Sequence, residues 1–102
     1  MNTLIDETRD DLARLCEQFR VRRLELFGSA TRADFDAATS DFDFIVEFEE
    51  MPPVEYADAY FGLLAELEKL LQRPVDLVVL SAVRNPYLRE SIDESRTVLY
   101  AA

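Results

Sequence analysis

The sequence predicts a single α/β domain over residues 1–102, with helices alternating with the strands of one small sheet. Apolar residues recur at three- and four-residue spacing in several segments, which is typical of amphipathic helices. In the shorter segments between them apolar residues alternate with polar ones, which is typical of strands. With 102 residues, 49% of them hydrophobic, we expect one modest core and no second lobe.

The N-terminal half is expected to contain a helix over residues 3–19 and a strand over residues 21–27. A sharp turn, a short helix and a loop should follow, and residues 41–48 should form a second strand. One side of this second strand is too bulky to be left in water, so helices should cover it. The residues on that side are Phe42, Phe44, Val46 and Phe48.

The C-terminal half begins after two prolines, which stop the second strand. The longest apolar stripe predicts a helix over residues 54–72, in which Gly62 is a sign of close contact with a neighbouring helix. Residues 75–80 are expected to form the third strand. A helix over residues 87–95 and a short closing strand over residues 97–100 complete the order.

Two aspartates are the first candidate site residues. Asp41 and Asp43 should project from the side of their strand opposite the phenylalanines. Two like charges this close are costly unless a cation lies between them, and Mg²⁺ is the first candidate for an all-oxygen site. A lone Asp-x-Asp is more often a solvated strand end. The pair therefore indicates a metal site only in combination with the residues that precede it.

Those residues form a candidate phosphate site. Gly28 permits a sharp turn and a close backbone approach, and Ser29 can cap a helix whose free N–H groups would face a phosphate. Taken alone, Gly-Ser is an ordinary turn. Arg32 could reach a triphosphate, or it could pair in solvent with Asp34 or Asp36.

Asp76 is a third candidate because it lies within an apolar strand, where an ionised carboxylate is expensive unless it is paired or bound to metal. The alternative is an aspartate at a strand edge in water.

Composition excludes several chemistries. The chain has no histidine, which removes histidine-based triads and metal sites, and only two glycines, too few for G-x-G-x-x-G or Walker loops. The single Cys16 is expected in the core and fits a cytoplasmic protein, and no apolar run suits a membrane span. A net charge of −10 disfavours direct binding of nucleic acid and favours a metal-dependent site or a basic protein partner.

The motifs resemble those of the DNA polymerase beta-like nucleotidyltransferases, in particular the minimal nucleotidyltransferases (MNT proteins). The resemblance covers nearly the whole chain, and it departs from the family pattern at Ala33, where many relatives have glycine. The matching segments are residues 26–32, 40–48, 73–79, 88–92 and 98–100.

The resemblance implies a mixed sheet with helices on one face and the carboxylates on the other, open face. It also implies transfer of AMP from ATP to a hydroxyl, with two Mg²⁺ ions. Asp41, Asp43 and Asp76 would be the catalytic metal ligands, and Gly28, Ser29 and Arg32 would bind the nucleotide.

A HEPN-domain ribonuclease toxin is the partner that the resemblance implies, with one of its tyrosines as acceptor and this chain as its antitoxin. A ribonuclease needs a basic surface, so opposite charges would steer the two proteins together, and either a homo- or a hetero-oligomer is compatible with this. Two alternatives stay open from the sequence. One is an antitoxin that inhibits by binding alone. The other is a small-molecule nucleotidyltransferase of the antibiotic-modifying kind, which would need a second subunit to hold its acceptor.

Overall fold

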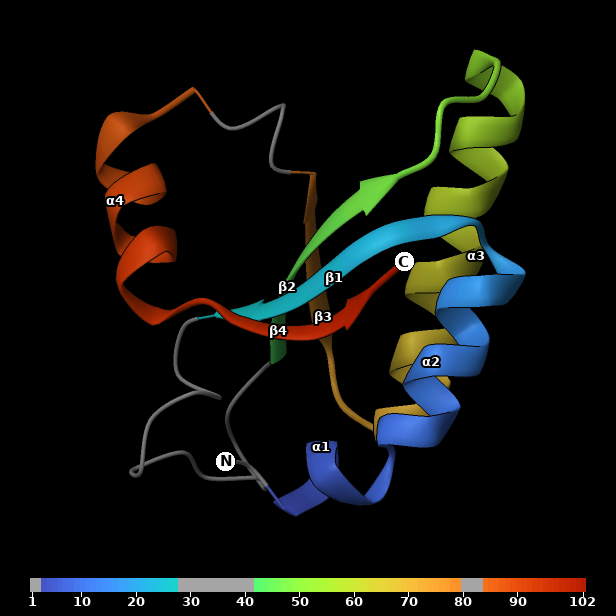
Figure 1. The fold of residues 1–102 in the computed structure, drawn as a ribbon, viewed down its shortest axis with the longest axis horizontal. Coiled ribbons are helices and arrows are strands. Elements are labelled where there is room, and N and C mark those ends of the chain that lie inside the picture. The colour runs from blue at the N-terminus through green and yellow to red at the C-terminus, as the bar shows by residue number, and fades with distance from the viewer. Residues whose placement is uncertain (1–2, 28–41, 80–83) are drawn as a thin grey trace.

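The computed structural model describes residues 3–27, 42–79 and 84–102, and Figure 1 shows their arrangement. Helices and strands alternate along the described chain much as the sequence predicts. The elements are α1 (Thr3–Glu7), α2 (Arg9–Gln18), β1 (Val21–Phe27), β2 (Phe42–Phe48), α3 (Pro53–Leu71), β3 (Val75–Val79), α4 (Pro86–Ser95) and β4 (Thr97–Ala101).

The first predicted helix differs from the prediction, because it is broken at Thr8 into α1 and α2. The Thr8 hydroxyl donates a hydrogen bond of 2.8 Å to the carbonyl oxygen of Leu4. Such bonds compete with regular helical geometry and bend helices. Ile5 of α1 and Leu12 of α2 both lie in the core on either side of this break.

The four strands form one mixed sheet in the order β3-β2-β1-β4. β1 is antiparallel to β2 and to β4, whereas β2 and β3 are parallel. α2 and α3 cover one face of this sheet (Figure 1). Phe42, Phe44 and Val46 of β2 are fully buried there, as the alternation predicted.

α4 lies on the other side of the sheet from α2 and α3 (Figure 1). Its Ile92 is buried against Phe27 of β1 and Ile45 of β2, in a small second core. The predicted mixed sheet is therefore confirmed, with the addition that one helix packs on the face expected to be open. Part of that face is thereby removed from solvent.

Two predicted packing details are also present. Cys16 is buried in the main core, and burial raises the pKa of its thiol to about 12. A methyl group built on Gly62 would come within 2.6 Å of Cε1 of Phe19, so the glycine marks the expected close contact of α3 with a neighbouring element.

Within the described ranges no helix is long and apolar enough to cross a membrane.

Candidate active site

Two of the predicted carboxylates stand opposite each other in the sheet. Asp43 of β2 pairs in register with Asp76 of β3. Neighbouring strands lie about 4.8 Å apart, and residues directly opposite each other project from the same face. Asp43 is half-buried and Asp76 is exposed, so both carboxylates can be reached from solvent.

The apolar pattern of β2 explains why Asp43 is on this face. Phe42 and Phe44 flank it and are completely buried on the opposite face, with ring centroids 6.2 Å apart. Because side chains alternate along a strand, a slip of one residue would expose both rings and bury the aspartate. The same core residues that stabilise the sheet therefore orient the carboxylate.

Asp76 is held in place by a tyrosine that the sequence analysis did not single out. The hydroxyl of Tyr60 on α3 donates a 2.5 Å hydrogen bond to the carbonyl oxygen of Leu77, the residue after Asp76. Burial raises the pKa of Tyr60, and the negative charge of Asp76 raises it further, so the hydroxyl stays protonated at neutral pH. This hydrogen bond connects β3 to α3 next to the carboxylate of Asp76.

Glu25 of β1 is a second residue that sequence reasoning missed. It lies on the same sheet face as Asp43, and it is only 1% exposed, the one charged side chain buried among the described residues. Two arginines compensate it: Arg23 Nε at 2.7 Å and Arg96 Nη2 at 2.8 Å. The hydrogen bond to Glu25 raises the pKa of Arg96 above its usual value.

Arg96 directly follows α4, so its bond to Glu25 fastens that helix to the sheet. A signal for this was present in the sequence: Glu25 stands between Leu24 and Leu26 in a strand that would otherwise be largely apolar.

Four predicted site residues, Gly28, Ser29, Arg32 and Asp41, lie outside the described residues, as do the short helix and loop expected there. Phe27, the last described residue before Gly28, pairs with Asp43. The described residues contain no group of three or more acidic or cysteine side chains that could hold a metal. Within them, the candidate site consists of Asp43 and Asp76.

Comparison with known proteins supplies the family. Residues 9–99 match the model of the nucleotidyltransferase domain. The chain belongs to this nucleotidyltransferase family. It is 38% identical over 94 residues to a Methanocaldococcus jannaschii protein named "Putative protein adenylyltransferase MJ0128", an alignment that covers 88% of this chain and 92% of the relative.

Solved structures agree with the assignment. One described as a "putative minimal nucleotidyltransferase" superposes with a TM-score of 0.74 at 28% identity and covers 95% of each chain. A chain of the complex between tri-AMPylated Shewanella oneidensis HEPN toxin and MNT antitoxin superposes with a TM-score of 0.65 at 19% identity, over 95% of this chain and 72% of that one. The predicted fold and the predicted enzyme class, a nucleotidyltransferase, are confirmed.

Proposed function

We propose that this nucleotidyltransferase transfers AMP from ATP to a tyrosine hydroxyl of a HEPN-class ribonuclease, and so acts as the antitoxin of that partner. The observation that carries the proposal is the pairing of Asp43 with Asp76 on one face of the sheet. The curated relative named as an adenylyltransferase and the structural neighbour with an AMPylated toxin support the reaction and the partner.

The residues fit a hard divalent cation, because two carboxylates on adjacent strands supply the oxygen ligands that Mg²⁺ prefers. In this proposal Asp41 is the third ligand, and the three aspartates hold two Mg²⁺ ions. Bound Mg²⁺ would stabilise charge on the phosphates and lower the pKa of the acceptor hydroxyl. Gly28 and Ser29 bind the β- and γ-phosphates through backbone N–H groups and a hydroxyl, and Arg32 adds a guanidinium.

In the transfer step the acceptor oxygen attacks the α-phosphorus of ATP. The bond from that phosphorus to the bridging oxygen breaks, pyrophosphate leaves, and the hydroxyl proton passes to water near Asp76. The product tyrosine carries a bulky group with a negative phosphate, which would oppose RNA binding at a nearby ribonuclease site. The proposal implies a cytoplasmic location, where ATP and the RNA target are found.

Co-expression with the HEPN partner, followed by intact-mass measurement of that partner, tests the proposal. The wild-type chain should add whole AMP increments, and Asp43→Asn or Asp76→Asn should abolish them. Asp58→Asn, which removes an exposed carboxylate of α3, is the matched control and should leave the increments unchanged. Full neutralisation of the toxin by Asp43→Asn, with no mass change on the partner, would instead establish inhibition by binding alone.

A further inference from the structure

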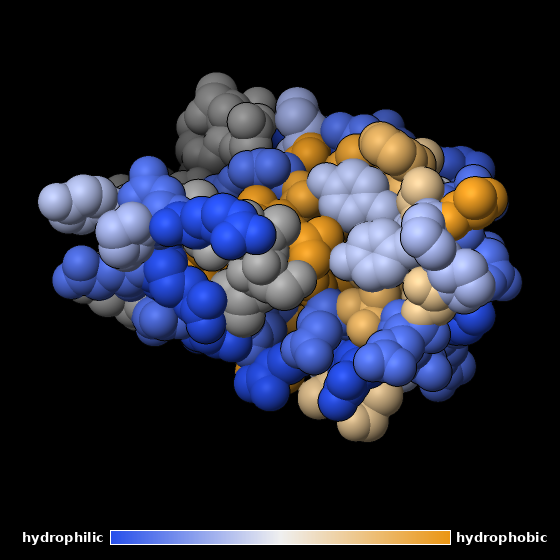
Figure 2. Space-filling model, turned by 90° about the horizontal axis from the view of Figure 1, so that it is seen from above, coloured by the Kyte–Doolittle hydropathy of each residue, from blue (hydrophilic) through white to orange (hydrophobic). Residues whose placement is uncertain are grey.

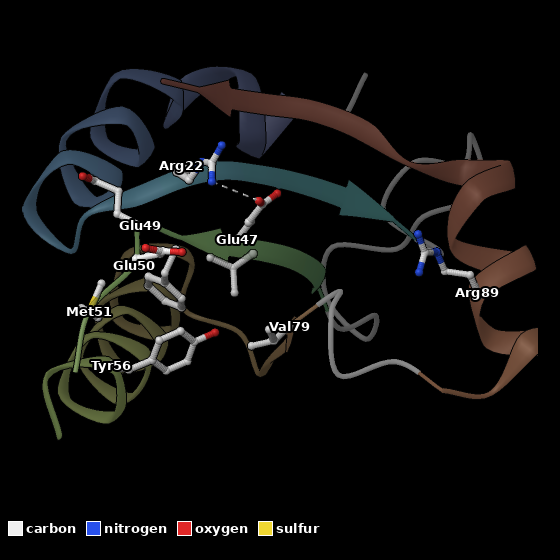
Figure 3. A pocket seen from close by; sticks show the side chains of 10 residues that line it. Arg22, Glu47, Glu49, Glu50, Met51, Tyr56, Val79 and Arg89 are labelled. Atoms are coloured by element: carbon white, nitrogen blue, oxygen red, sulfur yellow. Dashed lines mark ion pairs between the residues drawn. The ribbon is translucent and has the colours of Figure 1, made fainter. Parts of the chain in front are cut away.

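A cleft of about 890 Å³ opens between α3 and α4 at the far end of β2 from Asp43. It lies beyond Val46 and Val79, the last described pair between β2 and β3, where β2 continues to Phe48. Tyr56 on α3 and Arg89 on α4 point into the cleft from opposite sides (Figure 3). Seen from above, apolar surface lies in a hollow between polar residues (Figure 2).

Three exposed glutamates of the cleft, Glu47, Glu49 and Glu50, follow one another closely at the end of β2. Both arginines that line the cleft already have acidic partners: Arg22 lies 3.7 Å from Glu47, and Arg89 lies 3.9 Å from Asp93. Within the described residues neither Glu49 nor Glu50 forms an ion pair. The cleft therefore combines an apolar wall with two negative charges that have no ion-pair partner in the described part of the chain.

We propose that this cleft docks the acceptor protein, through a segment in which lysine or arginine stands next to an apolar side chain. The inference rests on the proposed function and adds to it the place where the acceptor binds. Charge complementarity selects this occupant, because a ribonuclease must present basic residues to RNA and this chain carries a net charge of −10. The apolar neighbour would contact Met51, Tyr56 and Val79, which are partly exposed.

The geometry also predicts how many residues of the acceptor separate the docked basic residue from the hydroxyl that receives AMP. Glu49 is six residues beyond Asp43, and its N–H still donates to the carbonyl oxygen of Arg20, so the separation corresponds to about 20 Å at about 3.3 Å per residue. An extended segment covers the same distance in roughly six residues. The docked basic residue should therefore lie about six residues from the hydroxyl that receives AMP.

The test compares two charge-reversed double variants of the full chain. Glu49→Lys with Glu50→Lys alters the cleft. Asp10→Lys with Glu17→Lys makes the same change of net charge on the exposed surface of α2 and serves as the control. The cleft variant should raise the KM for the acceptor, and its Kd measured directly without ATP, by about tenfold more than the control does. ATP binding should be equal in both.

Equal Kd values for the two double variants would overturn the cleft as the docking site, even if AMP transfer is intact. Absence of AMP transfer by the wild-type chain would overturn the proposed function, while the Kd comparison would still decide the docking site. Tyrosine peptides with a single lysine two, six or ten residues away provide a second measurement. The six-residue spacing should give the lowest KM, and a KM independent of spacing would contradict the geometry.

Discussion

Removal of the bond between Glu25 and Arg96 should destabilise this protein more than removal of any surface ion pair. Glu25 is buried, and its carboxylate depends on Arg96 and Arg23 for compensation. Arg96→Ala would leave the buried carboxylate with Arg23 alone and would release the end of α4 from the sheet. Arg23→Ala would leave the Arg96 bond in place.

The expected loss in the free energy of unfolding depends on how exposed the two arginine side chains are. Breaking a fully buried ion pair costs about 3–5 kcal/mol. Here the side chain of Arg96 is 28% exposed and that of Arg23 is 46% exposed, so water screens part of each interaction. We expect Arg96→Ala to lower the free energy of unfolding by about 2 kcal/mol, or roughly 10 °C in Tm for a domain of this size, and Arg23→Ala by about 1 kcal/mol or less.

Urea denaturation of each variant measures these losses. Arg14→Ala is the control, because Arg14 pairs with Asp11 on the surface of α2 and is 72% exposed, so its loss should stay below about 0.5 kcal/mol. A double-mutant cycle with Glu25→Gln isolates the coupling to Arg96. If Arg96→Ala costs no more than Arg14→Ala, the idea that the buried carboxylate depends on Arg96 is wrong.

Three further predictions concern the core. Gly62→Ala should lower the free energy of unfolding by about 1 kcal/mol in urea, since overpacking against Phe19 outweighs the gain in helix propensity, and adding Phe19→Leu should reverse the loss. Because the thiol of Cys16 has its pKa raised from 9.0 to about 12, the unfolded state ionises first, and stability should fall by about 1.4 kcal/mol between pH 8 and pH 10. Cys16→Ala should show a clearly smaller decrease, because what remains comes from groups such as Tyr60, whose pKa is also raised. Tyr60→Phe removes the hydrogen bond to Leu77 and should lower the free energy of unfolding by about 1 kcal/mol. An unchanged urea midpoint would show that water replaces this bond.

β2 illustrates what the sequence could predict. Its period of two, with phenylalanines at alternate positions, fixed both the buried face and the orientation of Asp43, because only one assignment hides the rings. The bounds of β1 were predicted to the residue, and those of the later elements that the structure describes to within one or two residues. Local patterns of this kind depend on residues close together in the chain, so they can be read without the fold.

The pairing of Asp43 with Asp76 depends on a different kind of information. No local pattern predicts the parallel register between two strands that a whole helix separates. The resemblance to a known family implied that the two aspartates share one site, and the register itself comes from the structure. The position of α4 was missed for a related reason. The resemblance implied that this face of the sheet is open, whereas ion pairing between Arg23 and Glu25 and the cover provided by α4 allow Glu25 to be buried there.

The buried ion pair also connects stability to the proposed nucleotide site. Arg96 holds the end of α4 against Glu25, and α4 in turn packs Ile92 onto Phe27. Phe27 pairs with Asp43 and immediately precedes Gly28, the first residue of the proposed phosphate-binding turn. Because the direction in which β1 ends determines where that turn begins, a loosened α4 should weaken ATP binding although none of its residues is proposed to contact the nucleotide. The small second core would therefore also help to position the chain for the chemistry proposed for Asp43 and Asp76.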